Sequence, residues 1–408
     1  MRPGFSQNGH SISDREPAIL CVSHLAWTHV WQRPQQLLSR LARHIPVQYV
    51  AEPEIVSGCQ REPQLIPVAE DGQLRAWQPT VPNRPALIAH WRSTYSRLVA
   101  DLLVREGWAA GHGDSLVPQR PLIAWFYTPT PWYLLDLLPF QAVVYDVMDE
   151  LTNFAGAASD LPWREAQLLA RSDLVFAGGR SLYAARRDRH SNVHCFPSGV
   201  DPKHFAAARA PETIVPTEIA ALPRPVLGYY GVIDERIDGE LLAELAARNP
   251  SWSVVLVGPI TKIDPASLPQ AANLHYVGQQ PYERLPAFLK GFDVCLTPFA
   301  CNEATRSISP TKALEYLAAG KPVVSTPVPD VVAAWSEVVW IAEGAEAFGR
   351  AIDAVLAEPD DQRVRRLARQ QREVERNDWE VIASEMASLL AAVLERRSGH
   401  RVDRLARL

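Results

Sequence analysis

The segment from Ser307 to Thr326 contains, close together, the residue types that an anion-binding site needs. Ser309 and Pro310 favour the first turn of a helix, where unpaired backbone N–H groups and the helix dipole attract an anion. Thr311 and Lys312 lie in the same turn and add a hydroxyl group and a full positive charge. The segment therefore predicts a phosphate site. A capped surface helix that leads into a buried strand is the alternative.

Glu315 lies one helical turn beyond this predicted anion site, on nearly the same helix face as Thr311 and Lys312. A carboxylate there can accept hydrogen bonds from two adjacent hydroxyl groups, such as those of a ribose. Gly320 predicts the end of the helix before the apolar strand Val323 to Thr326. The segment thus offers partners for both a phosphate and a ribose.

This segment resembles the donor-site helix of family 4 of the retaining glycosyltransferases, which have the two-domain GT-B fold. By this resemblance Glu315 binds the ribose of a sugar nucleotide, and Ser309 and Thr311 bind its phosphates. The family places a first acid where this chain has Ser307, so Glu303 and Arg306 are the nearby substitutes for holding the donor sugar. The stretch is similar to a bacterial subgroup that includes enzymes assigned to envelope polysaccharides, teichuronic acid among them.

Composition agrees with a soluble protein of two ordinary domains, since the chain has 408 residues, of which 47% are hydrophobic and 21% are charged. A net charge of −5 argues against a general nucleic-acid binder. No apolar run approaches the roughly 18–20 residues of a membrane span, and residues 1–17 lack the apolar core of a signal peptide. The five cysteines include no C-x-x-C pair. We therefore expect a cytoplasmic protein.

Short strand-like runs alternate with amphipathic helical stretches from residue 18 to about residue 340. This alternation predicts parallel sheets with helices on both faces. The strands expected are Ala18 to Ser23, Pro46 to Ala51, Leu122 to Tyr127, Ala142 to Val147, Leu174 to Ala177, Val193 to Phe196, Val226 to Tyr230, Ser253 to Val257, Leu274 to Val277, Val294 to Thr297, Val323 to Ser325 and Val338 to Ile341. The fold class predicted is α/β, of the GT-B type, with two Rossmann-like, doubly wound domains that face a cleft.

The pattern pauses around Pro197 to Asp201 and in the Ala/Pro-rich stretch 206–225, which indicates the crossing between domains. We predict an N-terminal acceptor domain over residues 1–200 and a nucleotide-sugar donor domain over residues 201–378. Residues 379–408 then form a helix that, by the resemblance, returns to the N-terminal domain, followed by a basic tail.

Ligands of open parallel sheets lie beyond the carboxyl ends of the strands, so the loops there supply the candidate residues. After the first strand come His24, Trp27 and Arg33, which we predict to bind the acceptor or the sugar. Arg33 at a helix start opposes the helix dipole, so an anionic ligand or solvent must compensate it. Trp27 and the nearby Trp31 can stack on a sugar ring, and packing in the core is the alternative for each.

Asp149 and Glu150 follow the strand Ala142 to Val147, and they are the carboxylates best placed to bind hydroxyl groups of the acceptor or the sugar. Helix-start acids without a ligand are the alternative. Asp146 and Asp149 do not form the Asp-x-Asp pair that holds a metal in the other common glycosyltransferase fold. We therefore predict no required metal and no cofactor.

In the second predicted domain, Gly231 ends a strand and permits close approach of a ligand to the backbone. The family commonly has an arginine directly after this glycine, and Val232 occupies that position, so Arg236 is the predicted cation for the diphosphate. By the same resemblance, the neighbourhood of Gly278 to Tyr282 brackets the nucleotide base. Gly258 and Gly278 lie at equivalent strand ends, and either of these two glycines can also serve only as a turn.

Together these residues predict transfer of a glycosyl group from a UDP- or GDP-linked sugar. Arg236 and Lys312 stabilise the charge that develops on the leaving phosphate, and Asp149 completes the catalytic set. The resemblance implies retention of configuration and a glycan acceptor, lipid-linked and therefore at the inner face of the plasma membrane. The helix Pro85 to Glu106 and the basic tail are the candidate membrane contacts, although the apolar stripe of this helix is also typical of a core.

Three other functions stay open. A sugar-nucleotide epimerase of the same fold would convert the donor without any acceptor. A catalytically silent protein would bind the sugar nucleotide without turnover, and a structural protein would not bind it at all.

Overall fold

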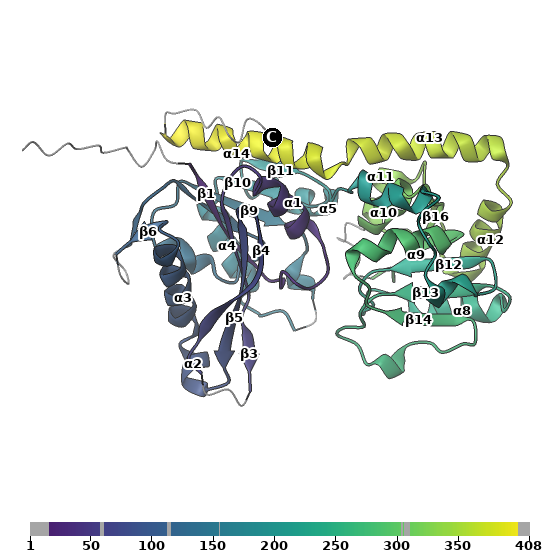
Figure 1. Cartoon of the computed structure of the whole chain (residues 1–408), viewed down its shortest axis with the longest axis horizontal. Helices are drawn as coiled ribbons and strands as arrows, with labels where there is room; N and C mark the ends of the chain where they lie inside the picture. The colour runs from purple at the N-terminus through teal and green to yellow at the C-terminus, as the bar shows by residue number, and fades with distance from the viewer. Residues whose placement is uncertain are drawn as a thin grey trace, which may run out of the picture.

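The computed structural model of the chain describes residues 16–57, 61–111, 116–154, 156–302, 305 and 311–398. These residues form two lobes that lie side by side, and a pair of long helices runs along one edge of both lobes (Figure 1). Each lobe is built on its own largely parallel sheet. The prediction of an α/β fold with two sheet domains is confirmed.

The N-terminal lobe contains, within the described residues, a nine-stranded sheet. Its strand order is β11-β10-β9-β8-β1-β2-β5-β3, and β4 is paired with β5 as the antiparallel member. The strands are β1 (Ala18–Ser23), β2 (Val47–Ala51), β3 (Glu54–Val56), β4 (Gln64–Asp71), β5 (Leu74–Pro82), β8 (Leu122–Phe126), β9 (Ala142–Val147), β10 (Leu174–Ala177) and β11 (Val193–Cys195). The short strands β6 (Ala109–Ala110) and β7 (Val117–Pro118) form a separate pair.

Helices cover both faces of this sheet, which explains why its central strand β1 is buried along its whole length. Ile19 and Cys21 face one core cluster, and Leu20 and Val22 face the other, because neighbouring side chains of a strand point to opposite faces. The helices of the lobe are α1 (Arg33–Leu41), α2 (Pro85–Ala89), α3 (Trp91–Arg105), α4 (Leu161–Arg171) and α5 (Arg180–Arg186), with single turns at Trp132–Asp136 and Leu151–Asn153.

Two parts of the N-terminal lobe differ from the sequence prediction. The strands β3, β4 and β5 were not predicted. For β3 and β4 the reason is that they are largely exposed and lack a buried apolar run. The expected helix Pro85 to Glu106 divides into α2 and α3, and its apolar stripe is core: Tyr95, Leu98, Val99 and Leu102 are at most 8% exposed. The hypothesis that this stripe contacts a membrane is therefore wrong for these four residues.

The C-terminal lobe contains, over its described residues, a six-stranded parallel sheet in the order β14-β13-β12-β15-β16-β17. Its strands are β12 (Val226–Tyr230), β13 (Ser253–Val257), β14 (Leu274–Gly278), β15 (Val294–Thr297), β16 (Val323–Ser325) and β17 (Trp340–Ile341). Its helices are α8 (Gly239–Arg248), α9 (Leu285–Gly291), α10 (Thr311–Ala318), α11 (Pro329–Trp335), α12 (Gly344–Leu356) and α13 (Asp360–Arg376), with single turns at Pro265–Ser267 and Tyr282–Arg284.

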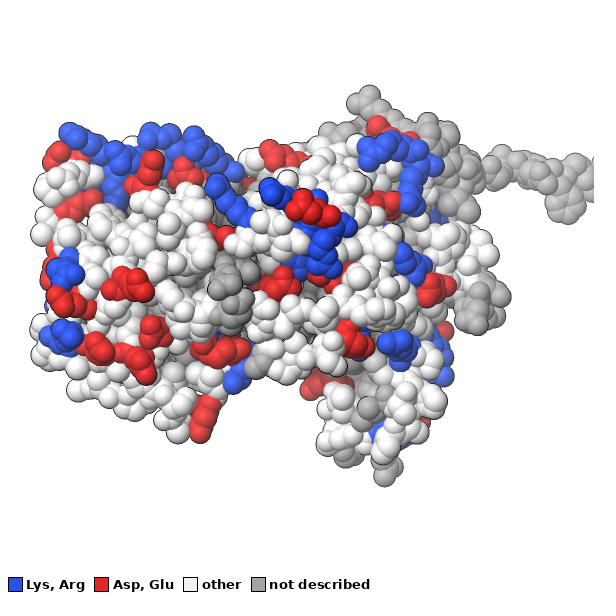
Figure 2. All heavy atoms as spheres, turned by 180° about the vertical axis from the view of Figure 1, so that it is seen from behind, with Lys and Arg blue, Asp and Glu red and all other residues white. Residues whose placement is uncertain are grey.

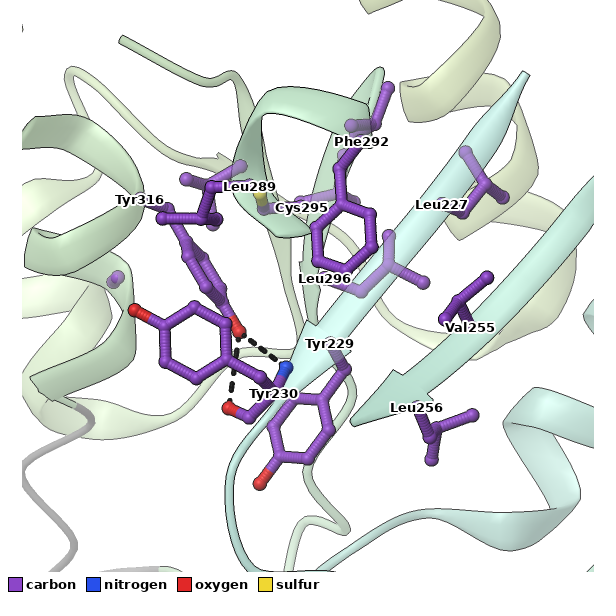
Figure 3. Packing of buried hydrophobic residues seen from close by; sticks show 14 of the residues in the cluster. Leu227, Tyr229, Tyr230, Val255, Leu256, Leu289, Phe292, Cys295, Leu296 and Tyr316 are labelled. Atoms are coloured by element: carbon purple, nitrogen blue, oxygen red, sulfur yellow. Dashed lines mark hydrogen bonds between the residues drawn. The ribbon is translucent and has the colours of Figure 1, made fainter. Parts of the chain in front are cut away.

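Figure 3 shows part of the core of this lobe, where buried side chains of β12 pack with those of neighbouring strands and helices. A Cβ atom on Gly228 would lie 2.1 Å from the ring of Phe292, so only glycine fits at this position in the strand. The hydroxyl group of Tyr316 accepts a hydrogen bond from the backbone N–H of Tyr230 at 3.0 Å. This bond fixes α10 to the end of β12, which is the edge where a ligand of a parallel sheet is expected.

The chain crosses between the lobes twice, at two segments that lie side by side. Val200 donates a backbone hydrogen bond to Asn377 at 2.8 Å, and Trp379 donates one to Val200 at 3.0 Å. A Cβ atom on Gly199 would lie 2.6 Å from the carbonyl oxygen of Asn377, so the close approach of the two crossings requires glycine. The first crossing leads into α6 (Pro202–Ala206), a turn at Ala207–Arg209, and α7 (Thr217–Ala220).

The last helix, α14 (Trp379–Ser398), packs on the N-terminal lobe, where Trp379, Ala383, Met386 and Leu390 join the core cluster that contains α1. The preceding helix α13 stays on the C-terminal lobe, so the two helices form the shared edge seen in Figure 1. Within the described residues, no helix combines the length and the apolar character that a membrane span requires.

Candidate active site

Two adjoining cavities lie between the lobes, at the carboxyl ends of the strands. The smaller has a volume of about 120 Å³ and contains Asp149 of the N-terminal lobe together with Arg236 and Lys312 of the C-terminal lobe. The larger has a volume of about 630 Å³. Val30, Trp31, Gly231 and Lys312 line both cavities. The predicted catalytic residues therefore lie around one cavity, although they come from distant parts of the chain.

The wall formed by α10 brings three predicted residues together. Thr311, Lys312 and Glu315 all line the smaller cavity. The ammonium group of Lys312 lies 3.1 and 3.3 Å from the two carboxylate oxygens of Glu315, and it also faces the ring of Tyr230 at 5.1 Å. The hydroxyl group of Tyr230 donates a second hydrogen bond to Glu315. Glu315 is only 6% exposed, so these two donors compensate the burial of its charge.

The residues before Thr311 that complete the predicted donor site lie outside the described residues. They are Glu303, Arg306 and Ser309, together with Ser307 at the position of the family's first acid. Their roles stay predictions. The described start of α10 is Thr311, and Gly320, with φ of 74°, follows the end of the helix in the left-handed conformation that glycine tolerates best.

Arg236 lies on the loop that follows β12 and is held in a fixed orientation by Asp234. Its guanidinium group donates two hydrogen bonds to this carboxylate, at 2.9 and 2.7 Å. Burial opposes the charge of Arg236, but the bonds to Asp234 raise its pKa above the ordinary value. The side chain therefore stays a cation at the wall of the smaller cavity.

Gly231 and Gly258 lie on two loops of the C-terminal lobe that meet beside the larger cavity. Gly231 has φ of 148°, and a Cβ atom on the neighbouring Gly258 would lie 1.8 Å from its carbonyl oxygen. Both glycines line the larger cavity. Gly278, with φ of 79°, ends β14 and is not among the lining residues, whereas Gln279 to Tyr282 directly after it are.

Asp149 and Glu150 are neighbours in sequence, but their side chains lie in different surroundings. Asp149 lines the smaller cavity, and its carboxylate has no hydrogen-bonding partner in the part of the chain that the structure describes. Burial raises the pKa of Asp149 to about 6, although Arg236 and Lys262 act to lower it. Glu150 points away from both cavities and pairs with the buried Arg186, whose guanidinium lies 2.9 and 3.1 Å from its oxygens.

Arg33 lies at the wall of the smaller cavity, but its guanidinium group is engaged inside the protein. It donates to Asp146 at 2.9 Å and to the carbonyl oxygen of Phe196 at 2.8 Å, and it is 1% exposed. The side chain is therefore a buried link between α1 and β9. The expectation that an anionic ligand or solvent compensates Arg33 is wrong, because Asp146 supplies that charge.

The other two candidates on the first loop also face the interior. Burial lowers the pKa of His24 to about 4, so the imidazole is neutral near pH 7, and it lines neither cavity. Trp27 is 8% exposed and packs edge-on against Tyr49, with 4.9 Å between ring centroids, while one side lines the larger cavity. Packing in the core therefore accounts for most of the Trp27 side chain.

Two residues that make contacts between the lobes, Gln36 and Lys262, were not singled out from the sequence. Gln36 lies one turn after Arg33 on α1 and donates a hydrogen bond to the hydroxyl group of Tyr282, at 3.0 Å across the cleft. The spacing from Arg33 placed it on the same helix face and is the signal that could have found it. Lys262 lies 4.2 Å from the ring of Phe154 on the opposite lobe, and no local pattern marks that contact. Within the described residues, no cluster of three or more His, Cys, Asp or Glu side chains could hold a metal ion.

Comparison with known proteins agrees with this geometry. Residues 224–358, which include the β12 loop, Arg236 and α10, match the family described as "Glycosyl transferases group 1". The matched segment lies within the C-terminal lobe. It supplies the cationic wall of both cavities, while the wall that carries Asp149 lies outside the matched residues.

The chain also resembles TuaH of Bacillus subtilis (strain 168), which is named as a glycosyltransferase of teichuronic acid biosynthesis. The two are 25% identical over 225 residues, which is 50% of this chain and 55% of TuaH. The chain thus matches about half the length of this curated relative.

Solved structures extend the fold comparison beyond residues 224–358. Sucrose-phosphate synthase from Thermosynechococcus elongatus is 18% identical with a TM-score of 0.68, covering 94% of this chain and all of that one. An alpha,alpha-trehalose-phosphate synthase (UDP-forming) from Burkholderia xenovorans, in complex with glucose-6-phosphate, is 14% identical with a TM-score of 0.64, covering 91% and 99%. Both likenesses support the GT-B fold for the two lobes together.

Proposed function

We propose that this protein is a retaining glycosyltransferase that moves a sugar from a nucleoside diphosphate sugar to a glycan acceptor, in the synthesis of a cell-surface polysaccharide. One observation carries the proposal: Arg236, Lys312 and the start of α10 face Asp149 of the other lobe across a single cavity. The match to the group 1 glycosyltransferases and the similarity to TuaH support the same function.

The cations of the C-terminal lobe suit the charge that this reaction develops. The bond between the anomeric carbon and the phosphate oxygen breaks, and the electron pair leaves with the nucleoside diphosphate. Arg236 and Lys312 stabilise that charge, each worth about 10²–10³-fold in rate by analogy with single oxyanion donors. In this proposal side-chain cations do this work, and neither a metal ion nor a cofactor is required.

Glu315 accepts hydrogen bonds from the ribose hydroxyls of a UDP- or GDP-linked donor, and Asp149 accepts one from a hydroxyl of the acceptor. The acceptor oxygen bonds to the anomeric carbon on the face that the diphosphate leaves, and its proton passes to the leaving phosphate. Configuration is therefore retained. Hydrogen bonds from Tyr230 and Lys312 hold the Glu315 carboxylate in a fixed orientation at the cavity wall for this role.

The acceptor in this proposal is lipid-linked, which draws a cytoplasmic enzyme to the inner face of the plasma membrane. Arginines are numerous on α13, and Figure 2 shows basic side chains gathered along the edge of the C-terminal lobe where this helix runs. Such an edge suits weak electrostatic contact with anionic lipid.

The test measures release of UDP or GDP from a panel of sugar nucleotides, with and without glycan acceptors from bacterial envelopes. We expect release that depends on the acceptor and a product with retained anomeric configuration. Conversion of the donor in the absence of acceptor would instead identify an epimerase. Nucleotide binding without any turnover would identify a catalytically silent protein, and no nucleotide binding would refute the proposal.

A further inference from the structure

The segment Trp31-Gln32-Arg33-Pro34-Gln35 has no role in the chemistry proposed above, although it forms part of the cleft. It comprises the last two residues of the loop after β1 and the first three residues of α1. Most of its polar groups form hydrogen bonds within the protein, so the segment has a fixed conformation. That conformation determines which of its side chains a ligand can contact.

Gln35 holds the loop before α1 at both of its ends. Its side-chain oxygen accepts a hydrogen bond from the backbone N–H of Gln32 at 3.0 Å, and its side-chain nitrogen donates to the carbonyl oxygen of Trp27 at 3.0 Å. Arg33 anchors the start of the helix to Asp146. Gln35 and Arg33 are both fully or almost fully buried, so these bonds are shielded from water.

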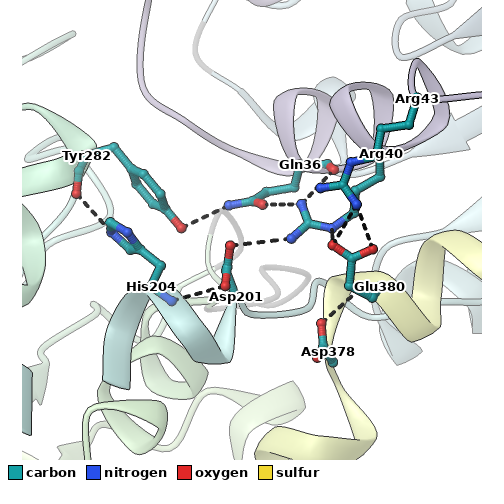
Figure 4. Close-up of polar contacts among 8 residues, drawn as sticks. All are labelled: Gln36, Arg40, Arg43, Asp201, His204, Tyr282, Asp378 and Glu380. Carbon is teal, nitrogen blue, oxygen red and sulfur yellow. Dashed lines mark hydrogen bonds and ion pairs between the residues drawn. The ribbon is translucent and has the colours of Figure 1, made fainter. Parts of the chain in front are cut away.

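This bracing directs Trp31 across the cleft to the C-terminal lobe. Its ring stacks beside Tyr282, with 5.8 Å between centroids and 29° between planes. Tyr282 is itself held: Gln36 donates to its hydroxyl group, and His204 stacks on it at 4.0 Å (Figure 4). The two aromatic side chains therefore form one preorganised wall from opposite lobes.

This aromatic wall belongs to the larger cavity, beside the proposed diphosphate site. Trp31 and Tyr282 line that cavity together with Gly258 and Gln279 to Pro281, and Trp31 also lines the smaller one. Lys312 likewise lines both, and Glu315 lines the smaller one, so a nucleotide with its diphosphate at Lys312 and its ribose at Glu315 would extend its base into the larger space. A volume of about 630 Å³ lies within the range of small-ligand sites, roughly 300–1,000 Å³.

We infer that Trp31 is a nucleoside-binding residue, supplied to the donor site by the N-terminal lobe. Its indole packs on the nucleoside of the sugar nucleotide, and Gln35 and Arg33 are positioning residues that hold it there. This role rests on the proposed function and adds to it a donor contact outside the residues that match the group 1 glycosyltransferases. It implies that tight nucleotide binding requires both lobes.

The experiment is calorimetric titration of the full chain with UDP, GDP and inorganic pyrophosphate. Trp31→Ala should weaken binding of the preferred nucleoside diphosphate about fivefold or more, since base–aromatic stacking contributes on that scale. Its affinity for pyrophosphate should stay within about twofold, because that ligand lacks the nucleoside. Trp31→Phe keeps an aromatic ring and should retain most of the nucleotide affinity.

Trp163→Ala is the matched control, because Trp163 is also a partly exposed tryptophan that packs against another, Trp132, but lies outside both cavities. It should bind nucleotide as the wild type does. Thermal unfolding without ligand verifies that each variant is folded.

Two results would overturn the role of Trp31. One is nucleotide affinity in Trp31→Ala within about twofold of the wild type, and the other is an equal loss for pyrophosphate. A wild-type protein that binds neither nucleotide would instead refute the proposed function itself, so the two failures are distinguishable.

Discussion

The two walls of the cleft use charged residues in different ways. On the C-terminal wall, Arg236 and Lys312 pair with acids of their own lobe and still line the cavity. On the N-terminal wall, Arg33 pairs with Asp146 and Glu150 pairs with Arg186, and both pairs direct these charges toward the protein interior. Asp149 is the carboxylate that this wall presents.

The two walls therefore differ in role. The C-terminal wall concentrates positive charge at the cavity, where the proposed function places the leaving diphosphate. The ion pairs of the N-terminal wall instead fix α1 and the loops after β1 and β9. Substitutions on the two walls should therefore affect different properties of the protein. Those on the N-terminal wall should affect folding first, and those on the C-terminal wall should affect turnover first.

The largest effect is expected for Arg33→Ala. This change leaves Asp146 as an unpaired carboxylate that is 0% exposed, so the free energy of unfolding should fall by about 3–5 kcal/mol. Urea unfolding measures the loss. Arg43→Ala is the control, because the Arg43–Glu380 pair is exposed and should contribute less than about 1 kcal/mol. An Arg33→Ala variant as stable as the wild type would contradict the structural assignment of this wall.

Lys312→Ala should lower the rate of sugar transfer by about 10²–10³-fold, because it removes a cation from the leaving diphosphate. Steady-state kinetics of nucleotide release measures this. Lys290→Ala is the control, since Lys290 lies on α9 and donates to backbone oxygens of Ala210 and Pro211, away from both cavities. A loss confined to KM would mean that Lys312 binds the donor without stabilising the transition state.

The pH dependence of transfer should report Asp149. Because burial raises its pKa to about 6, the carboxylate is protonated below that pH and ionised above it. If the ionised form accepts the hydrogen bond of the acceptor, the rate should rise as the pH rises through about 6, up to tenfold per pH unit. Asp149→Asn should remove this limb of the profile, whereas Glu150→Gln should leave it. A limb that persists in Asp149→Asn would assign it to another group.

Glu315→Ala should weaken nucleotide binding by about 1 kcal/mol or more, the scale of a lost hydrogen bond to the ribose. Titration with UDP and GDP measures the change. Tyr230→Phe separates the two roles of the carboxylate, because it removes only the hydrogen bond that Tyr230 donates to Glu315. Unchanged affinity in Glu315→Ala would remove the ribose contact from the proposal.

Much of the fold could be predicted from local pattern. The runs Ala18–Ser23, Ala142–Val147 and Ser253–Val257 are strands with the predicted bounds, because buried parallel strands are continuously apolar. Strands β3 and β4 escaped prediction since their stability comes from pairing at the sheet edge, beside β5. Their exposed residues carry no such signal.

The site residues could likewise be predicted where they are close in sequence. Thr311, Lys312 and Glu315 lie within little more than one helical turn, so helix geometry predicts that they share a face. The roles of Asp149 and Glu150 could not be told apart, because the difference depends on Arg186, which is distant in sequence. Trp31 was visible as a candidate for stacking, but its contact with Tyr282 depends on how the lobes meet.

By itself, then, the sequence determined the class of the fold and the composition of the cationic wall, since apolar periodicity and helix spacing act over a few residues. The tertiary structure alone decided which charged side chains face the cavity and which form ion pairs inside a lobe. Arg33 shows the reason: at the start of a helix its charge requires a partner, and only folding brings Asp146, far along the chain, to within 2.9 Å of it.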